Sequence, residues 1–138
     1  RLGSVIFSIF ISGGQMRNYI LDIDGTVGED IPNEQPERMV DCAFFPDALE
    51  TVNRWYDEGH KITFFTARTE ELRAVTEAWL KKCGFKYHGL LMGKPRGGNY
   101  HYVDNLDIRS AKYEGVFCER IFWSGGTPPN QIDLPRVH

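Results

Sequence analysis

The stretch Tyr19-Ile20-Leu21-Asp22-Ile23-Asp24-Gly25-Thr26 decides the fold class of this chain. Its first five residues are nearly all apolar, which is typical of a strand buried on both faces of a parallel sheet. Two carboxylates lie at the end of this run, and in a regular strand they would point to opposite sides. The glycine that follows allows the chain to turn, so that both carboxylates can face one ligand. The stretch therefore predicts a buried strand that ends in a site.

Strands and helices alternate along the rest of the chain. Apolar runs predict four further strands, at residues 61–65, 89–92, 100–103 and 116–123. Apolar residues at spacings of three and four predict two helices, at residues 46–58 and 69–83. Because helices of this length between strands imply right-handed crossovers, we expect an α/β fold. Its architecture is predicted to be a Rossmann-like, three-layer αβα sandwich around a mostly parallel sheet, without a cap domain.

The ends of the two predicted helices carry capping signals. Pro46 opens the first helix and Gly59 closes it, whereas Thr69 is expected to cap the second and Gly84 to stop it. The buried stripe of the first helix is expected at Leu49, Val52 and Tyr56, with Ala48 and Trp55 beside it. The buried stripe of the second is expected at Leu72, Val75, Trp79 and Cys83.

Length and composition exclude several classes of protein. The chain has 138 residues, of which 41% are hydrophobic and 25% charged, as in a soluble single domain. It has no apolar run near the 18 or so residues that span a membrane, and its net charge of −3 does not favour nucleic-acid binding by the whole surface. Its three cysteines are an odd number without CxxC spacing, which argues against a disulfide framework and favours a reducing, cytoplasmic location.

Three segments of the chain are distinguished by composition. Residues 1–15 precede the first methionine, Met16, and include an apolar run at 5–11. They are interpreted as an expression remnant, an upstream translation or a processed end, with a signal peptide or an extra edge strand as alternatives. Residues 16–124 are predicted to form the functional domain, and the Gly/Pro-rich residues 125–138 to form a tail.

Chemically active side chains recur at the ends of the predicted strands. The second strand runs into Thr66-Ala67-Arg68, the third into Gly93-Lys94-Pro95-Arg96 and the fourth into Asp104-Asn105, with Asp107 close by. Because ligands of parallel α/β sheets bind at the carboxyl ends of the strands, we expect these groups to converge on one rim with the first two aspartates.

Phosphoryl transfer is the chemistry that uses this combination. Mg²⁺ prefers carboxylate oxygens, which Asp22 and Asp104 can supply. A carboxylate can also attack phosphorus, and Asp24 is suited to donate and accept the proton. Lys94 and the hydroxyl of Thr66 would then stabilise charge on the transferring oxygens.

These residues resemble the four motifs of the haloacid dehalogenase-like phosphatase superfamily, in the expected order and over roughly residues 16–123. The resemblance implies that Asp22 is the nucleophile and a Mg²⁺ ligand. It implies that Asp24 is the general acid and base, with its main-chain carbonyl on the metal. Thr66 would bind phosphate, Lys94 would tie the nucleophile to the phosphoryl group, and Asp104 would hold the metal directly or through water.

The chain departs from the superfamily pattern in two places. The fourth motif is often a double acid, whereas the second position here is Asn105, with Asp107 as a candidate substitute. Neither the gap from Asp22 to Thr66 nor that from Thr66 to Lys94 leaves room for a folded cap of 50 residues or more. In the superfamily this goes with large substrates, or with a homo-oligomer in which a neighbour closes the site. The acid at Asp24 favours hydrolysis of phosphate esters, because dehalogenases and phosphonatases lack it.

Substrate contacts are therefore expected from loops at the strand ends. The candidate substrate-binding residues are Gly25, Thr26, Ala67, Arg68, Arg96 and Asn99. A solvated surface position is the alternative for each arginine. The predicted function is a Mg²⁺-dependent phosphatase that acts on a phosphorylated small molecule through an aspartyl-phosphate. A phosphotransferase or phosphomutase, a phosphatase of nucleic-acid ends, and a non-catalytic binding module remain the alternatives.

Overall fold

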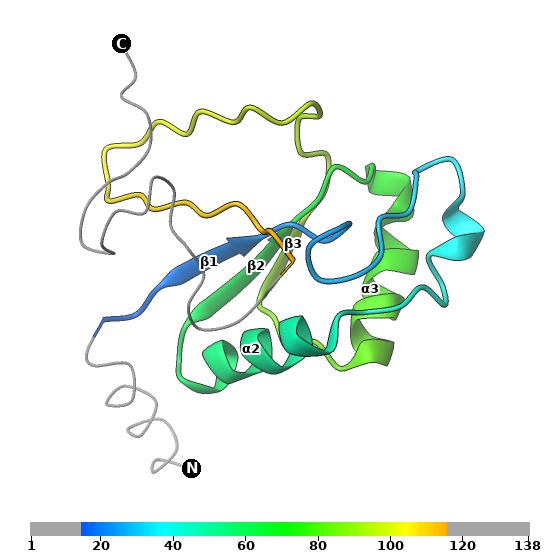
Figure 1. Ribbon diagram of the computed structural model, residues 1–138, viewed down its shortest axis with the longest axis horizontal. Helices are drawn as coiled ribbons and strands as arrows, with labels where there is room; N and C mark the ends of the chain where they lie inside the picture. The colour runs from blue at the N-terminus through cyan, green and yellow to red at the C-terminus, as the bar shows by residue number, and fades with distance from the viewer. Residues whose placement is uncertain (1–14, 116–138) are drawn as a thin grey trace. The chain divides into compact units, whose positions relative to one another are not determined.

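The computed structural model describes residues 15–115 of the chain. The chain divides into two compact units between Pro95 and Arg96. The first unit holds every helix and strand of the described residues (Figure 1). The second, described over residues 96–115, contains turns and irregular backbone.

Three parallel strands form the sheet of the first unit. They are β1 (Asn18–Leu21), β2 (Lys61–Phe65) and β3 (Gly89–Leu91), in the spatial order β1-β2-β3. Both strand pairs are parallel, and a helical crossover follows each of the first two strands. The parallel sheet and its crossovers confirm an α/β, Rossmann-like fold.

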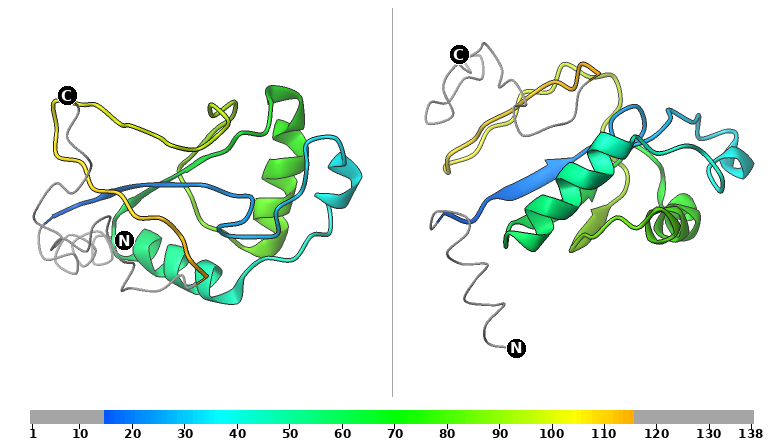
Figure 2. Two further views of the ribbon diagram at one scale, coloured as in Figure 1. Left: turned by 45° about the horizontal axis from the view of Figure 1, so that its top comes forward. Right: turned by 60° about the horizontal axis from the view of Figure 1, so that its bottom comes forward.

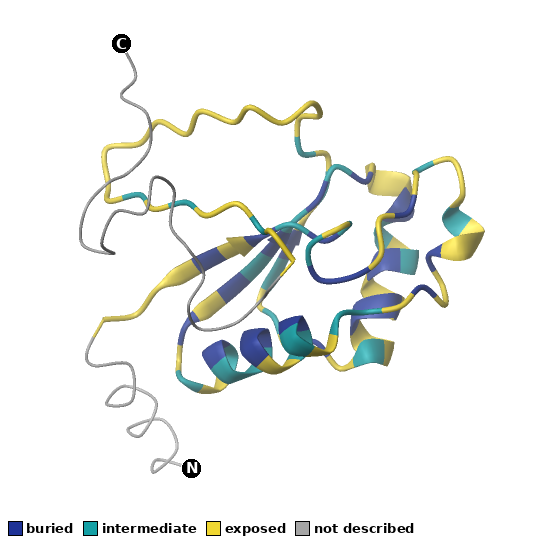
Figure 3. Ribbon diagram, viewed as in Figure 1, coloured by how far each residue is buried: buried dark blue, intermediate teal, exposed yellow. Residues whose placement is uncertain are grey.

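One face of this sheet is buried. Tyr19 pairs with Ile62, Leu21 pairs with Phe64, and Phe64 in turn pairs with Leu90. All five side chains are buried, and paired residues of parallel strands point to the same face (Figure 3). On the opposite face Ile20 and Leu91 are 53% and 51% exposed. Of the three layers predicted, the described residues therefore provide the sheet and the helical layer against its Tyr19 face.

The first crossover helix, α2 (Pro46–Asp57), packs on this face through its tryptophan. Figure 2 shows this helix beside the strands of the sheet. The Trp55 ring stacks on that of Tyr19, with the ring centroids 3.8 Å apart. The buried residues of the helix are Ala48, Thr51, Val52 and Trp55. The predicted positions Leu49 and Tyr56 are only half-buried. The buried face is rotated from the predicted one because the large Trp55 ring, which was expected beside the stripe, makes the central contact with the sheet.

The second crossover begins with a short 3-10 turn, η2 (Glu70–Leu72), and continues as α3 (Arg73–Cys83). Thr69 precedes the turn, but its hydroxyl makes no capping hydrogen bond, so the predicted cap is wrong. Gly84 ends the helix in the left-handed region with φ of +93°, as predicted. The residues that the helix buries are Thr76, Trp79 and Leu80, whereas the predicted Val75 and Cys83 are half-buried.

The loop between β1 and α2 packs against α3. It contains the 3-10 turn η1 (Pro36–Arg38). The indole N–H of Trp79 donates to the main-chain carbonyl of Cys42 at 2.9 Å. A Cβ atom on Gly28 would lie 2.6 Å from the Trp79 ring, so only glycine allows this close approach. The loop that carries the first motif is thereby fixed to the second crossover.

The second unit corrects one strand prediction. Residues 100–103 form no strand, and Tyr102 and Val103 are exposed. The side chains of residues 100–103 favour a strand, but a strand also needs a neighbouring strand that bonds its backbone. Within the described residues this segment has no such neighbour. Immediately before it, Gly97, Gly98 and Asn99 all have positive φ, which turns the backbone. The strand predicted at 116–123, and the segments 1–14 and 125–138, lie outside the described residues.

Neither membrane spans nor disulfides are found in the described part. No helix within residues 15–115 is long and apolar enough to cross a bilayer. Cys42 and Cys83 are free thiols, and burial raises the pKa of both. Cys118 lies outside the described residues.

Two histidines beside the sheet make the stability of this fold depend on pH. His60 Nδ1 accepts the main-chain N–H of Arg17, and His88 Nδ1 accepts that of Ile62, each at 3.0 Å. Desolvation, and secondarily the positive charges of Arg17 and Lys61 respectively, lowers the pKa of each imidazole. Because the unfolded chain binds these protons more readily, the free energy of unfolding is expected to fall as the pH drops below about 6.5.

Urea unfolding between pH 7.5 and 5.5 measures this dependence. His60→Gln, whose amide oxygen can still accept the Arg17 N–H, is expected to flatten the curve. His101→Gln, at an exposed position in the second unit, is expected to leave it unchanged. A wild-type free energy of unfolding that is constant over this pH range would contradict the assignment.

Candidate active site

Three strand ends meet at the carboxyl edge of the sheet. Asp22 follows β1, Thr66 follows β2, and Lys94 lies three residues beyond β3. The N–H of Thr66 donates to the carbonyl of Leu91 at 2.9 Å, and the N–H of Lys94 donates to the carbonyl of Thr66 at 2.8 Å. These backbone bonds extend the strand pairing beyond the sheet and hold the lysine segment beside the end of β2.

The Asp22 carboxylate has two polar partners. Lys94 Nζ donates to Asp22 Oδ1 at 2.8 Å, and Thr26 Oγ1 donates to Oδ2 at 3.2 Å. The side chain of Asp22 is 36% exposed and that of Lys94 is 16% exposed. The carboxylate is therefore oriented by a cation and a hydroxyl while part of it faces solvent.

A tight turn separates the two aspartates of the motif from the rest of the loop. The carbonyl of Ile23 accepts the N–H groups of Thr26 and Val27, both at 3.0 Å. Gly25 has φ of +80°, a conformation that side chains disfavour. Ile23 itself is fully buried, so it anchors the turn while Asp22 and Asp24 flank it at the sheet edge.

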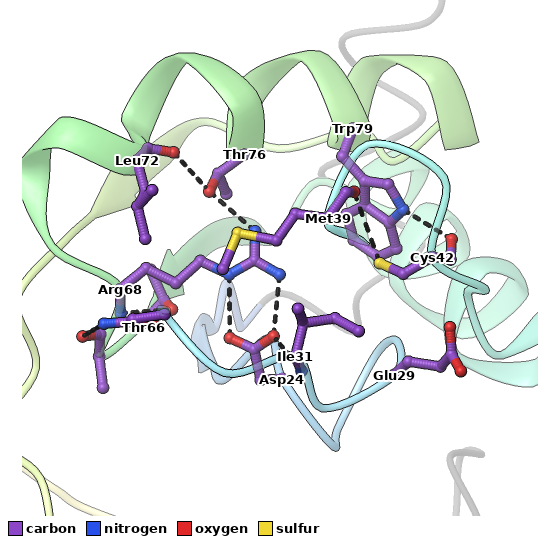
Figure 4. Close-up of polar contacts among 12 residues, drawn as sticks. Asp24, Glu29, Ile31, Met39, Cys42, Thr66, Arg68, Leu72, Thr76 and Trp79 are labelled. Carbon is purple, nitrogen blue, oxygen red and sulfur yellow. Dashed lines mark hydrogen bonds and ion pairs between the residues drawn. The ribbon is translucent and has the colours of Figure 1, made fainter. Parts of the chain in front are cut away.

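Asp24 is held by an arginine inside the protein. Arg68 Nη2 donates to Asp24 Oδ1 at 2.8 Å and Arg68 Nε donates to Oδ2 at 3.0 Å, which makes the pair bidentate (Figure 4). The N–H of Ile31 adds a weaker bond of 3.3 Å to Oδ1. Arg68 is only 1% exposed. Arg68 is therefore buried beside Asp24, whereas the sequence had suggested it as a substrate contact.

Thr76 contacts this pair, although no pattern in the sequence predicted it as a candidate. Its hydroxyl accepts a bond from Arg68 Nη1 at 2.9 Å and donates to the carbonyl of Leu72 at 2.8 Å (Figure 4). The signal in the sequence is a polar residue four positions after Leu72 and three before Trp79, both of which belong to the predicted apolar stripe. A hydroxyl at such a position has to find partners within the protein.

The remaining candidates of the first unit lie around this network. Thr66 is fully buried, and its Oγ1 accepts the N–H of Arg68 at 3.1 Å. The carbonyl of Ala67 accepts a bond of 3.4 Å from the Asn33 side chain. Gly25 is exposed and Thr26 is half-buried. The first unit thus brings together the candidates from the first three strand ends.

The other candidates belong to the second unit. Asp104 is exposed, and its Oδ1 accepts the N–H groups of Asn105 and Leu106 at 2.7 and 3.1 Å. Its Oδ2 accepts the hydroxyl of Tyr102 at 3.1 Å, a bond that raises the pKa of the tyrosine. The Asn99 side chain lies 3.2 Å from a ring nitrogen of His101. Arg96 and Asp107 are exposed in the same unit.

The donors at the sheet edge are hard oxygen atoms. Among residues 15–115, no three His, Cys, Asp or Glu side chains are grouped closely enough to hold a metal ion. Within the same residues, no hydrogen bond uses the main-chain carbonyl of Asp24. Because the Arg68 cation donates to both carboxylate oxygens of Asp24, it would repel a second cation from that side chain. The main-chain carbonyl of Asp24 is therefore the atom that suits a hard cation such as Mg²⁺.

Comparison with known proteins places this geometry in a class. A family model described as the LNS2 domain of PITM 1-3 matches residues 19–106, a range that includes β2, β3, all of β1 but its first residue, and Asp104. The parallel sheet with Asp22 and Asp24, Thr66 and Lys94 at successive strand ends is that of the haloacid dehalogenase-like superfamily of phosphatases. Within that superfamily, the chain belongs to the LNS2 domain family.

Two curated bacterial proteins are similar to part of the chain. A Bacillus cereus protein described provisionally as a nucleotidase is 28% identical over 106 residues, which are 70% of this chain and 56% of that protein. An Oceanobacillus iheyensis protein with the same provisional description is 40% identical over 47 residues, or 34% of this chain and 25% of that protein. The chain thus spans about half the length of the first relative and a quarter of the second.

A solved structure shares the fold. A chain from the structure of a Pnkp1/Rnl/Hen1 complex superposes with a TM-score of 0.50 at 23% sequence identity, and the match covers 65% of this chain and 31% of that one. This likeness supports the α/β fold.

Proposed function

We propose that this chain carries the catalytic core of a phosphatase that hydrolyses phosphate monoesters through an aspartyl-phosphate on Asp22. The contact of 2.8 Å between Lys94 Nζ and Asp22 Oδ1 carries the proposal, because it joins a partly exposed carboxylate to a cation 72 positions away in the sequence. A nucleophile and a partner for phosphoryl charge are the two groups that this chemistry needs first.

The reaction would proceed in two displacements. An oxygen of the Asp22 carboxylate attacks phosphorus, the bond from phosphorus to the ester oxygen breaks, and Asp24 protonates the departing oxygen to release an alcohol. Water then attacks the phosphorus of the aspartyl-phosphate while Asp24 accepts its proton, and inorganic phosphate leaves with Asp22 restored. Lys94 and the hydroxyl of Thr66 would stabilise charge on the transferring oxygens in both steps.

The same residues suit a magnesium ion. The Asp22 carboxylate and the Asp24 main-chain carbonyl would hold Mg²⁺, and the superfamily resemblance adds Asp104 as a candidate third ligand. The cation would neutralise phosphoryl charge, while Lys94 keeps the Asp22 carboxylate directed to the substrate. Asn105 or Asp107 would complete the outer shell.

The substrate class is proposed from the relatives and from the glycine-rich segment after Lys94. Two similar proteins are described provisionally as nucleotidases, which supports nucleoside monophosphates as the first esters to test. Arg96 is an exposed cation for a second anionic group, and Asn99 lies in the left-handed region next to two glycines. Gly25, Thr26 and Ala67 would offer backbone and hydroxyl contacts to the phosphate.

A screen of phosphate esters tests this function. Phosphate release is measured from nucleoside 5′- and 3′-monophosphates, sugar phosphates, an aryl phosphate and end-phosphorylated oligonucleotides, each with Mg²⁺ or with EDTA. We expect Mg²⁺-dependent release from at least one ester. Transfer to an added sugar or nucleoside would show a phosphotransferase instead, and no release from any member of the panel would contradict the proposal.

A further inference from the structure

The Arg68 guanidinium is the buried charge of this site. Its side chain is fully buried, whereas that of its partner Asp24 is 17% exposed. A buried guanidinium is costly unless its charge is paired and its N–H groups are bonded. Here Nε and Nη2 donate to the two oxygens of Asp24, and Nη1 donates to the hydroxyl of Thr76.

This arrangement restrains the orientation of the Asp24 carboxylate. A bidentate pair requires the carboxylate and the guanidinium to lie nearly in one plane, so rotation of the carboxylate would break both bonds. The N–H of Ile31 contacts the same Oδ1 at 3.3 Å. The orientation of Asp24 therefore depends on where the guanidinium is held.

The guanidinium is held in turn by α3. The Thr76 hydroxyl accepts a hydrogen bond from Arg68 and donates one to the carbonyl of Leu72, so the direction of each bond is determined. Thr76 is fully buried and lies on the second crossover helix, opposite the loop that carries Asp24. A connected polar network thus runs from the helix to the acid at the sheet edge.

We propose that Arg68 and Thr76 are positioning residues, which set the Asp24 carboxylate for proton transfer. This inference rests on the proposed function of Asp24. Arg68 itself does not contact substrate, because its three side-chain nitrogens are directed to Asp24 and Thr76 inside the protein. A displacement of an acid by about 1 Å can cost 10²-fold in rate, so the network acts on turnover and not on substrate affinity.

Matched threonine variants test the positioning role. Thr76→Val removes the hydroxyl with little change in volume, and we expect kcat to fall about tenfold or more while KM changes less than twofold. Thr76→Ser keeps the hydroxyl and is expected to restore most of kcat. Thr51→Val, at a buried threonine of α2, controls for the general loss of a buried hydroxyl and is expected to affect stability without changing kcat. All variants are assayed where urea unfolding shows them folded.

A second measurement observes the network without catalysis. In ¹⁵N NMR spectra, the Arg68 Nε–H of a buried bidentate pair should give a separate, slowly exchanging signal. Asp24→Asn should abolish this signal and Thr76→Val should shift it. Absence of the signal in the wild-type chain would overturn the network.

The outcomes separate the two proposals. If the wild-type chain hydrolyses a phosphate ester but Thr76→Val and Thr76→Ser have the same kcat, the positioning role is wrong and the phosphatase proposal stands. If the wild-type chain hydrolyses no ester, the phosphatase proposal fails and the positioning role fails with it, even where NMR shows the pair.

Discussion

Asp22→Asn is expected to lower phosphate-ester turnover by about 10³-fold or more, because an amide cannot act as the attacking carboxylate. The substitution preserves the size of the side chain. Its remaining oxygen can still accept Lys94 Nζ, which lies 2.8 Å from Oδ1 in the wild-type protein. The free energy of unfolding should therefore fall by no more than about 2 kcal/mol. Steady-state phosphate release and urea unfolding measure the two effects on the same samples.

A surface aspartate provides the control for this variant. Asp57, at the end of α2, pairs with Lys86 at 2.8 Å, and both side chains are about half exposed. Asp57→Asn also removes a carboxylate that faces a lysine, but it lies outside the proposed chemistry and should leave turnover within twofold. If Asp22→Asn kept more than a tenth of wild-type activity, another group would have to be the nucleophile.

Asp24→Ala is expected to cause the largest loss of stability, about 3 to 5 kcal/mol, since it leaves the Arg68 guanidinium buried without its counter-charge. The side chain of Arg68 is fully buried and cannot turn to solvent without disrupting its contacts with α3. The same change at Asp22 should cost much less, because Lys94 keeps part of its surface in solvent. Asp24 is therefore expected to stabilise the fold, and this role can be measured separately from its proposed role in proton transfer.

The double variant Asp24→Ala/Arg68→Met gives the decisive comparison. Removing both charges leaves no uncompensated ion, so the double variant should be more stable in urea than Asp24→Ala alone. It should remain inactive, since the acid is absent. The single variant Arg68→Met completes the comparison. If the loss of unfolding free energy in the double variant equals the sum of the losses in Asp24→Ala and Arg68→Met, the two side chains do not stabilise each other.

Local pattern was sufficient to predict the sheet edge. The apolar runs that end in Asp22 and in Thr66 follow from the requirement that a parallel strand be buried, and the rule that ligands bind at the carboxyl ends of strands brought Lys94 into the same group. The family match confirms the superfamily resemblance carried by these residues. The individual catalytic roles stay predictions until the variants are measured.

Local pattern was insufficient where two elements meet. The apolar stripes of both helices are rotated from their predicted positions, because ring contacts such as Trp55 on Tyr19 depend on the shape of the sheet. The strand predicted at 100–103 is wrong because propensity is local, whereas a strand is made by its partners.

The amino-acid sequence by itself determined the α/β class and the set of polar groups at the strand ends, because apolar periodicity and motif order are properties of the chain. Only the tertiary structure decided that Arg68 turns inward to Asp24 and Thr76. An arginine after a strand can face solvent, substrate or an internal acid with the same local pattern. Its direction is settled by whether the folded protein supplies a carboxylate and a hydroxyl in reach of its N–H groups, which here come from residues 44 positions before it and 8 positions after it.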